Sequence, residues 1–183
     1  MKSFMLALAL LCFIGLTQVV FAQSEAEALI TASVANALTL VNVDGDWGVL
    51  SPGQTYVITA GGFKNPPGPG EGAGIVVGPV GFEVDGNAGS NVVVTLVLPS
   101  QLVSDDGNGG IPTSNWTFGW NYDNDPTAPF AASGPIVGSA VTLGIGGGGA
   151  TGLFLGATLA VPQTAFAGGY TGQVIGSAAY TGN

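Results

Sequence analysis

The stretch VGFEVDGNAGSNVVVTLVLP, residues 80–99, carries the pattern on which the fold prediction rests. Two runs rich in Val, Leu and Phe lie on either side of the cluster DGNAGSN. β-Branched and aromatic side chains favour strands, whereas Asp-Gly accepts the positive φ that tight turns need. The stretch therefore predicts two strands separated by a turn.

The same alternation of apolar runs and turn clusters continues along the chain. Strands are predicted at residues 29–43, 55–60, 74–84, 92–98, 115–122, 137–143, 153–161 and 170–180. The longest turn cluster, at residues 61–74, is interpreted as a surface loop. No window shows sustained helical periodicity. We therefore predict one all-β domain, a single immunoglobulin-like antiparallel β-sandwich with Greek-key connections.

The beginning of the chain, MKSFMLALALLCFIGLTQVVFAQ, has the features of a secretory signal peptide. One Lys precedes an apolar run that ends in the pattern Val20-Phe21-Ala22, after which cleavage is predicted. The signal peptide then covers residues 1–22 and the domain residues 23–183. Cys12, the only Cys, lies in the signal peptide, so the exported chain folds without disulfides. The expected location is the cell surface or an extracellular appendage, reached through the periplasm.

The chain is strongly acidic, with 11 Asp and Glu residues against 2 Lys and Arg residues and no His. Beyond the signal peptide the one basic side chain is Lys64, which is interpreted as a loop residue. Such a surface repels phosphate groups, so nucleic acid is excluded as a partner and anionic membranes are disfavoured. No later apolar stretch approaches the roughly 20 residues that span a bilayer, so membrane insertion is not expected.

Catalytic chemistry has little support in this composition. Without His, and without Cys beyond the signal peptide, the usual nucleophile and base pairs are missing. Asp44 with Asp46, or Glu83 with Asp85, offers the two carboxylates of a glycosidase, but each pair lies beside Gly in a predicted turn. The glycine run at residues 146–149 lacks the Lys-Ser or Lys-Thr of a phosphate loop and is interpreted as a hairpin connection. We therefore expect no enzyme and no organic cofactor.

Calcium is the metal with the best candidate ligands, because it binds several oxygen atoms at once. Two acidic loops supply such atoms: Asp105, Asp106 and Asn108 in the first, and Asp123, Asn124 and Asp125 in the second. Neither loop has the spacing or the closing Glu of an EF-hand. Turn formation is therefore favoured over calcium binding for both loops.

The segment NWTFGWNYDNDP begins with four aromatic residues at alternate positions, Trp116, Phe118, Trp120 and Tyr122. In a strand all four rings lie on one face. Buried, they supply a large part of the core; exposed, they form a platform for sugar rings. We favour the core, because sandwich strands normally bury one face.

Both ends of the exported chain read as strands with one apolar face. A detached strand of this kind can complete the sheet of a neighbouring molecule, and a head-to-tail contact repeated in this way gives a filament. We therefore predict an N-terminal donor strand at residues 28–40 and a sandwich completed by strand exchange. The sequence leaves open whether this strand pairs in its own molecule or in another copy. The predicted subunit-interface residues are Ala28, Ile30, Ala32, Val34, Leu38, Leu40, Gly168, Tyr170, Gly172, Val174 and Tyr180.

Three segments, beginning at Ala37, Val80 and Leu153, together resemble a family of exported bacterial, pilin-like domains of unknown function. That family has the elements Phe-Gly-x-Leu, Phe-x-Val-x-Gly, Gly-Ala-x-Leu-x-Val and Ala-Gly-x-Tyr-x-Gly followed by Tyr. The matching positions are Trp47, Gly48, Leu50, Phe82, Val84, Gly86, Gly156, Ala157, Leu159, Val161, Ala167, Gly168, Tyr170, Gly172 and Tyr180, with Trp47 in place of Phe. The resemblance implies a pilin-like sandwich with a role in surface structures and no catalytic residues.

Chaperone-usher pilins end in a strand with a Gly twelve residues before a penultimate aromatic residue. Gly168 and Tyr180 have this separation, although three residues follow Tyr180. We therefore predict a subunit of an extracellular filament, pilus or surface layer, whose partners are copies of itself and, for assembly, a periplasmic chaperone and an outer-membrane usher. The alternative is a self-contained secreted adhesin or carbohydrate-binding module.

Overall fold

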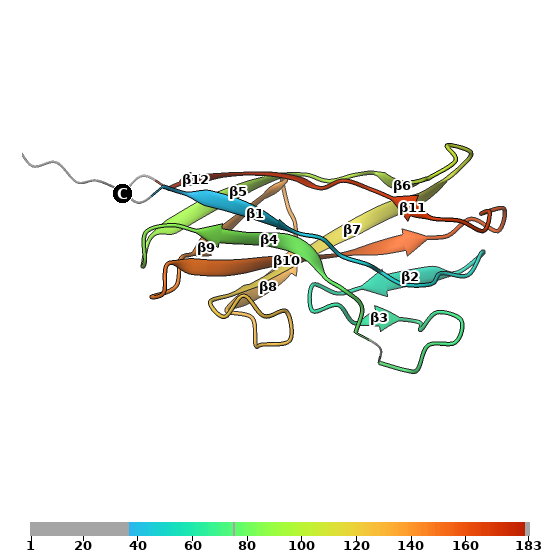
Figure 1. Cartoon of the computed structure of the whole chain (residues 1–183), viewed down its shortest axis with the longest axis horizontal. Coiled ribbons are helices and arrows are strands. Elements are labelled where there is room, and N and C mark those ends of the chain that lie inside the picture. The colour runs from blue at the N-terminus through green and yellow to red at the C-terminus, as the bar shows by residue number, and fades with distance from the viewer. Residues whose placement is uncertain (1–36, 75, 182–183) are drawn as a thin grey trace, which may run out of the picture. The chain divides into compact units, whose positions relative to one another are not determined.

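The computed structural model describes residues 37–74 and 76–181, which form strands and connecting loops with no helix among them (Figure 1). These residues belong to one compact unit. The strands are β1 (Thr39–Val43), β2 (Thr55–Ile58), β3 (Lys64–Asn65), β4 (Val80–Asp85), β5 (Asn91–Val97), β6 (Gln101–Ser104), β7 (Gly110–Asn121), β8 (Ala132–Pro135), β9 (Ala140–Gly144), β10 (Ala150–Ala160), β11 (Tyr170–Thr171) and β12 (Ile175–Tyr180). None of the described segments is a helix that could cross a membrane.

The strands form two antiparallel sheets. The large sheet has the order β1-β4-β10-β7-β6-β11, with β2 and β3 beside the second half of β10 and β8 beside β7. The small sheet has the order β12-β5-β9. The predicted all-β antiparallel sandwich is therefore confirmed, while its likeness to the immunoglobulin fold stays a prediction.

The apolar side chains form two core clusters along the large sheet. The first cluster lies between the two sheets and combines Phe82 and Leu153 of the large sheet with Val94 and Leu143 of the small sheet. The second cluster is built on β2, the beginning of β7 and the end of β10, and its buried residues are Tyr56, Ile58, Val77, Ile111, Leu159 and Val161. No strand of the small sheet contributes a buried residue to the second cluster. This half of the large sheet is covered by loops instead.

Strand β7 begins before the predicted strand at residues 115–122 and contains a β-bulge. Gly156 faces Thr117 across the ladder, whereas Thr158 faces Ser114, so β7 has one extra residue. The extra residue lies at Asn115, whose φ is 47°. Because of the extra residue, odd-numbered side chains point to the core before the bulge and even-numbered ones after it. Ile111 and Trp120 therefore both pack in core clusters.

The predicted single strand at residues 170–180 is wrong, because the chain changes sheets within it. Tyr170 and Thr171 pair with β6 in the large sheet, whereas residues 175–180 pair with β5 in the small sheet. The crossing occurs at Gly172, where a Cβ atom would lie 2.6 Å from Leu102 Cδ2. Tyr170, Val174 and Tyr180, which belong to the predicted subunit-interface set, all pack against core clusters of their own molecule.

Three other segments also differ from expectation. The region predicted as a loop at residues 61–74 contains β3, and Lys64 within it is buried. The glycine run at residues 146–149 joins β9 and β10, which belong to different sheets, so it closes no hairpin. Of the predicted strand at residues 29–43, the structure describes β1, which pairs with β4 of its own molecule.

Candidate functional site: an apolar groove over the second core cluster

A groove of about 700 Å³ opens over the second core cluster. One wall is formed by residues 45–50 and 52, which connect β1 to β2, and the other by residues 165–172 and 174, which include the crossing between sheets. Leu102, Ile111 and Val161 lie between these walls. Asp46 is the only charged residue in the lining. The groove exists because the small sheet does not extend over this half of the core.

Two tryptophans meet at the groove. The ring centroids of Trp47 and Trp116 lie 5.9 Å apart, with an angle of 49° between the ring planes. The indole N–H of Trp47 is buried and has no hydrogen-bond acceptor within the described part of the chain. Gly48, which follows, has a φ of +69°, and a Cβ atom there would lie 2.7 Å from Glu71 Oε1. The Trp-Gly pair noted in the sequence is therefore part of the groove wall.

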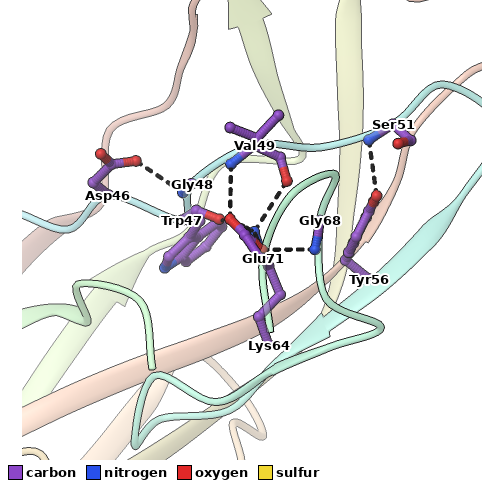
Figure 2. A network of polar contacts seen from close by, with 9 residues as sticks. All are labelled: Asp46, Trp47, Gly48, Val49, Ser51, Tyr56, Lys64, Gly68 and Glu71. Carbon is purple, nitrogen blue, oxygen red and sulfur yellow. Dashed lines mark hydrogen bonds and ion pairs between the residues drawn. The ribbon is translucent and has the colours of Figure 1, made fainter. Parts of the chain in front are cut away.

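Lys64 holds the first wall in place through the backbone of Trp47 and Val49. The Lys64 ammonium group is fully buried and donates to the backbone carbonyls of Trp47 and Val49, each at 3.0 Å, and to Glu71 Oε1 at 2.7 Å (Figure 2). These three contacts use all three ammonium protons. The ring of Tyr56 lies below the ammonium, which is 5.8 Å from the ring centroid. Lys64 is the only Lys or Arg among the described residues, and it is buried. The surface formed by these residues therefore carries no basic side chain.

Glu71 completes this network from the loop that follows β3. Its carboxylate accepts hydrogen bonds from the backbone N–H groups of Gly68, at 2.6 Å, and Val49, at 3.3 Å, and forms an ion pair with Lys64. The hydrogen bond from Lys64 is the main cause that lowers the pKa of Glu71, and the two backbone N–H groups add to it against the opposing effect of burial. The carboxylate therefore stays ionised to a lower pH than usual and ties three segments of backbone together (Figure 2).

The lowered pKa of Glu71 makes the stability of the fold dependent on pH. A carboxyl group with a lowered pKa stabilises the fold above its ordinary pKa of 4.5, and this contribution is lost as the pH falls through the value in the fold. We expect Glu71→Gln to cost on the order of 2 kcal/mol at neutral pH, and to lose less on acidification than the unchanged chain. Urea denaturation at neutral pH and below pH 4.5 measures both effects.

Asp123→Asn is the matched control for the loss of one exposed carboxylate. It should leave the unfolding free energy at neutral pH nearly unchanged. A Glu71→Gln variant that loses as much stability on acidification as the unchanged chain would contradict the role given to this carboxylate.

Four of the predicted interface residues, Gly168, Tyr170, Gly172 and Val174, line the groove. Leu38 and Leu40 are partly buried against the first core cluster, and Leu40 pairs with Val84 within the molecule. The structure thus brings the C-terminal set together at one site and leaves Leu38 and Leu40 at another. The predicted residues Ala28, Ile30, Ala32 and Val34 lie outside the described residues.

Tyr180 is separated from the groove residues, because it belongs to β12 of the small sheet. Its ring packs against the first core cluster, and its hydroxyl accepts a hydrogen bond from the backbone N–H of Asn87 at 2.7 Å. This contact joins the end of the chain to the turn between β4 and β5. Gly168 lies at the groove and Tyr180 in the small sheet, so the two residues do not belong to one strand.

The aromatic face of β7 lies mainly in the core. Trp120 is buried, and Trp116 and Phe118 pack against the first cluster. Tyr122 follows the end of the strand and is 53% exposed, with its ring centroid 5.2 Å from that of Trp120. Three of the four rings thus agree with the predicted core face, and Tyr122 does not.

The two acidic loops use their carboxylates to shape their own turns. Asp106 accepts hydrogen bonds from the Ser104 hydroxyl and the Asn108 backbone N–H, and the bond from Ser104 is the main cause that lowers the pKa of Asp106. Asp125 accepts from the hydroxyl and backbone N–H of Thr127, with the same effect on its pKa. Within residues 37–74 and 76–181 no three His, Cys, Asp or Glu side chains gather as a metal site would require.

Of the candidate carboxylate pairs, only Asp46 lines the groove. Asp46 accepts a hydrogen bond from the Gly48 backbone N–H and lines the groove, but Asp44 does not line it. Glu83 and Asp85 alternate with the buried Val84 on β4, and Asp85 accepts from the Thr39 hydroxyl at 3.3 Å. The lining of the groove therefore includes one carboxylate, that of Asp46.

Sequence reasoning missed the role of Lys64. Lys64 is the only basic residue after residue 22 of an acidic chain, which was itself a signal, because an opposite charge nearby stabilises a charged group. No protein-family model matches the chain, and no curated protein matches it. The resemblance to exported pilin-like domains therefore stays a prediction.

Proposed function

We propose that this protein is a non-enzymatic structural subunit of an extracellular bacterial filament, pilus or surface layer, whose copies join by β-strand addition. The proposal rests on the absence of charged residues and Pro from three strands at sheet edges. Strands β1, β9 and β12 lie at sheet edges and contain no charged residue and no Pro. Proteins that remain monomeric normally protect such edges with charges, Pro or bulges, because unpaired backbone groups otherwise recruit another chain.

The small sheet adds support for association. None of its three strands contains a charged residue. On its outer face Val97 and Ile175 lie directly opposite each other and are 62% and 53% exposed. A neutral face of this kind meets another copy without a desolvation penalty for charges. In the proposed assembly the chain is exported by its predicted signal peptide, and a periplasmic chaperone and an outer-membrane usher are the proposed partners in assembly.

Electron microscopy and sedimentation of the chain from Gln23 onward test this function. We expect fibres, or a ladder of multiples, that resist mild denaturant. Ala179→Lys places a charge on the edge strand β12 and should weaken association roughly tenfold, equivalent to about 1.4 kcal/mol. Thr95→Lys places the same charge on the same face of the central strand β5 and should weaken association less. A chain that stays monomeric at high concentration would reject the proposal.

A second candidate function is a secreted adhesin or carbohydrate-binding module. It is favoured by Trp47 and Trp116, which line a groove with little charge, as sugar-binding sites often require aromatic surfaces. Tryptophan emission that shifts when polysaccharide is added to a monomeric chain would support this function and reject the first.

A further inference from the structure

We propose that the groove over the second core cluster binds a quaternary ammonium group on an uncharged body, the chemistry of choline and of alkyltrimethylammonium ions. The inference goes beyond the proposed function, because it assigns a small-molecule ligand to the subunit and does not depend on contacts between copies. It rests on aromatic side chains on both walls, on carboxylates beside both walls, and on the scarcity of side-chain acceptors in the lining.

Aromatic side chains reach the groove from three segments of the chain. Trp47 belongs to the first wall and Trp116 to β7, and their ring centroids lie 5.9 Å apart. Phe166 and Tyr170 belong to the second wall, and Phe166 is 63% exposed. The face of an aromatic ring attracts a cation that lies within about 6 Å of its centroid. A methylated ammonium group gains from such faces twice, because its methyl groups also bury apolar surface.

Carboxylates stand beside both walls of the groove. Asp46 on the first wall is the one charged residue of the lining, and its Oδ1 accepts the Gly48 backbone N–H at 2.8 Å. Beside the second wall, Asp105 Oδ2 packs so closely on Gly169 that a Cβ atom there would overlap it, and the Asp105 backbone N–H donates to the Gly169 carbonyl at 3.0 Å. The only basic side chain among the described residues, Lys64, is fully buried. A cleft with charges of one sign concentrates ions of the opposite sign.

The lining has few of the acceptors that a primary ammonium group needs. Lys64 shows this requirement, since its three protons are taken by two backbone carbonyls and a carboxylate. Within the lining of the groove, the only side chains with oxygen atoms are those of Asp46, Tyr170 and Thr171. A quaternary ammonium group carries a positive charge but no N–H, so it leaves no donor unpaired when it enters an apolar site. The groove therefore favours a quaternary ammonium group over a primary amine.

The same lining restricts the rest of the ligand. A phosphate or carboxylate group would meet Asp46, and the lining holds no Lys or Arg to pair with it. Sugar hydroxyl groups would need more hydrogen-bonding side chains than the lining supplies. The volume of about 700 Å³ falls in the usual range for small-molecule sites and leaves room for an apolar body beside the ammonium group. The ligand is therefore a cation whose remaining part is uncharged and mainly apolar.

Titration with choline and with its neutral carbon analogue tests the charge of the ligand. In the analogue a tert-butyl group of the same shape replaces the trimethylammonium group. We expect choline to bind roughly tenfold more tightly than the analogue, and phosphocholine to bind more weakly than choline because its phosphate meets Asp46. Calorimetry and tryptophan emission measure binding, with the ionic strength held constant by NaCl. Equal affinity for choline and the analogue, or no binding of choline, would overturn the proposal.

Two variants of the groove test the residues assigned to the site. Asp46→Asn keeps an acceptor for the Gly48 backbone N–H, and Phe166→Leu keeps an apolar side chain at an exposed position, so both should fold like the unchanged chain. Each should weaken choline binding roughly threefold to tenfold and leave binding of the carbon analogue unchanged. Asp123→Asn and Phe63→Leu make the same changes outside the groove and should leave choline affinity unchanged. Choline affinity that survives both groove variants would place the cation elsewhere and reject this site.

The outcomes also separate this site from the two candidate functions. A chain that forms fibres but binds no choline would reject the ligand and leave the proposed function standing. Choline binding by a chain that stays monomeric would support the site and reject the filament. Tryptophan emission that shifts with polysaccharide but not with choline would reject the quaternary ammonium ligand in favour of a sugar.

Discussion

Replacing Lys64 by Met is expected to lower the free energy of unfolding by about 3–5 kcal/mol, because it removes one partner of a buried ion pair. The carboxylate of Glu71 and the carbonyls of Trp47 and Val49 all lose their donor. For a domain of this size the corresponding fall in the melting temperature is roughly 10 °C. Denaturation followed by tryptophan fluorescence measures it, and the groove wall should loosen at the same time.

The double variant Lys64→Met/Glu71→Leu is the control for this interpretation. Replacing both partners of a buried pair with apolar side chains costs much less than removing one, so part of the stability should return. A Lys64→Met variant that loses under about 1 kcal/mol would show that the buried ammonium does not hold the wall.

Replacing Phe154 by Ala should also cost about 3–5 kcal/mol, although Phe154 points away from both core clusters. The side chain is 1% exposed, and its ring centroid lies 6.2 Å from that of Phe130. Phe130 itself crosses Gly119 of β7, where a Cβ atom would come within 2.4 Å of its ring. The loop between β7 and β8 therefore covers the outer face of β10, and the substitution leaves a cavity beneath it.

Asn121 holds this loop in place and helps to explain the size of the effect. Its side chain donates to the Asp125 carbonyl at 2.6 Å and accepts from the Asp125 backbone N–H at 3.4 Å. The control is Phe63→Ala, because Phe63 is 54% exposed, and it should change stability by less than about 0.5 kcal/mol. Phe154→Ala with a cost below about 1 kcal/mol would contradict the proposed cover.

The candidate site could be predicted only in part from the sequence. The alternation in residues 170–180 put Tyr170, Val174 and Tyr180 on one apolar face, and in the structure all three pack against core clusters. It could not show that the strand changes sheets, because either sheet offers the same backbone hydrogen bonds. The sequence also did not show the groove wall at residues 45–50 and 52, because Lys64 and Glu71, which hold it, and residues 165–172, which face it, lie in other segments of the chain.

The sequence by itself determined the all-β class and the core-facing side of three of the four alternate aromatic residues at positions 116–122, because strand propensity, turn residues and the period of two act over a few neighbouring residues. Only the tertiary structure decided that β10 pairs with β4 and then β2, that Lys64 is buried, and that half of the core opens into a groove. Those features depend on pairing and packing between distant segments, which local composition does not encode. A lone Lys in a loop and a lone Lys inside a core look the same until the partners that satisfy its charge are brought to it.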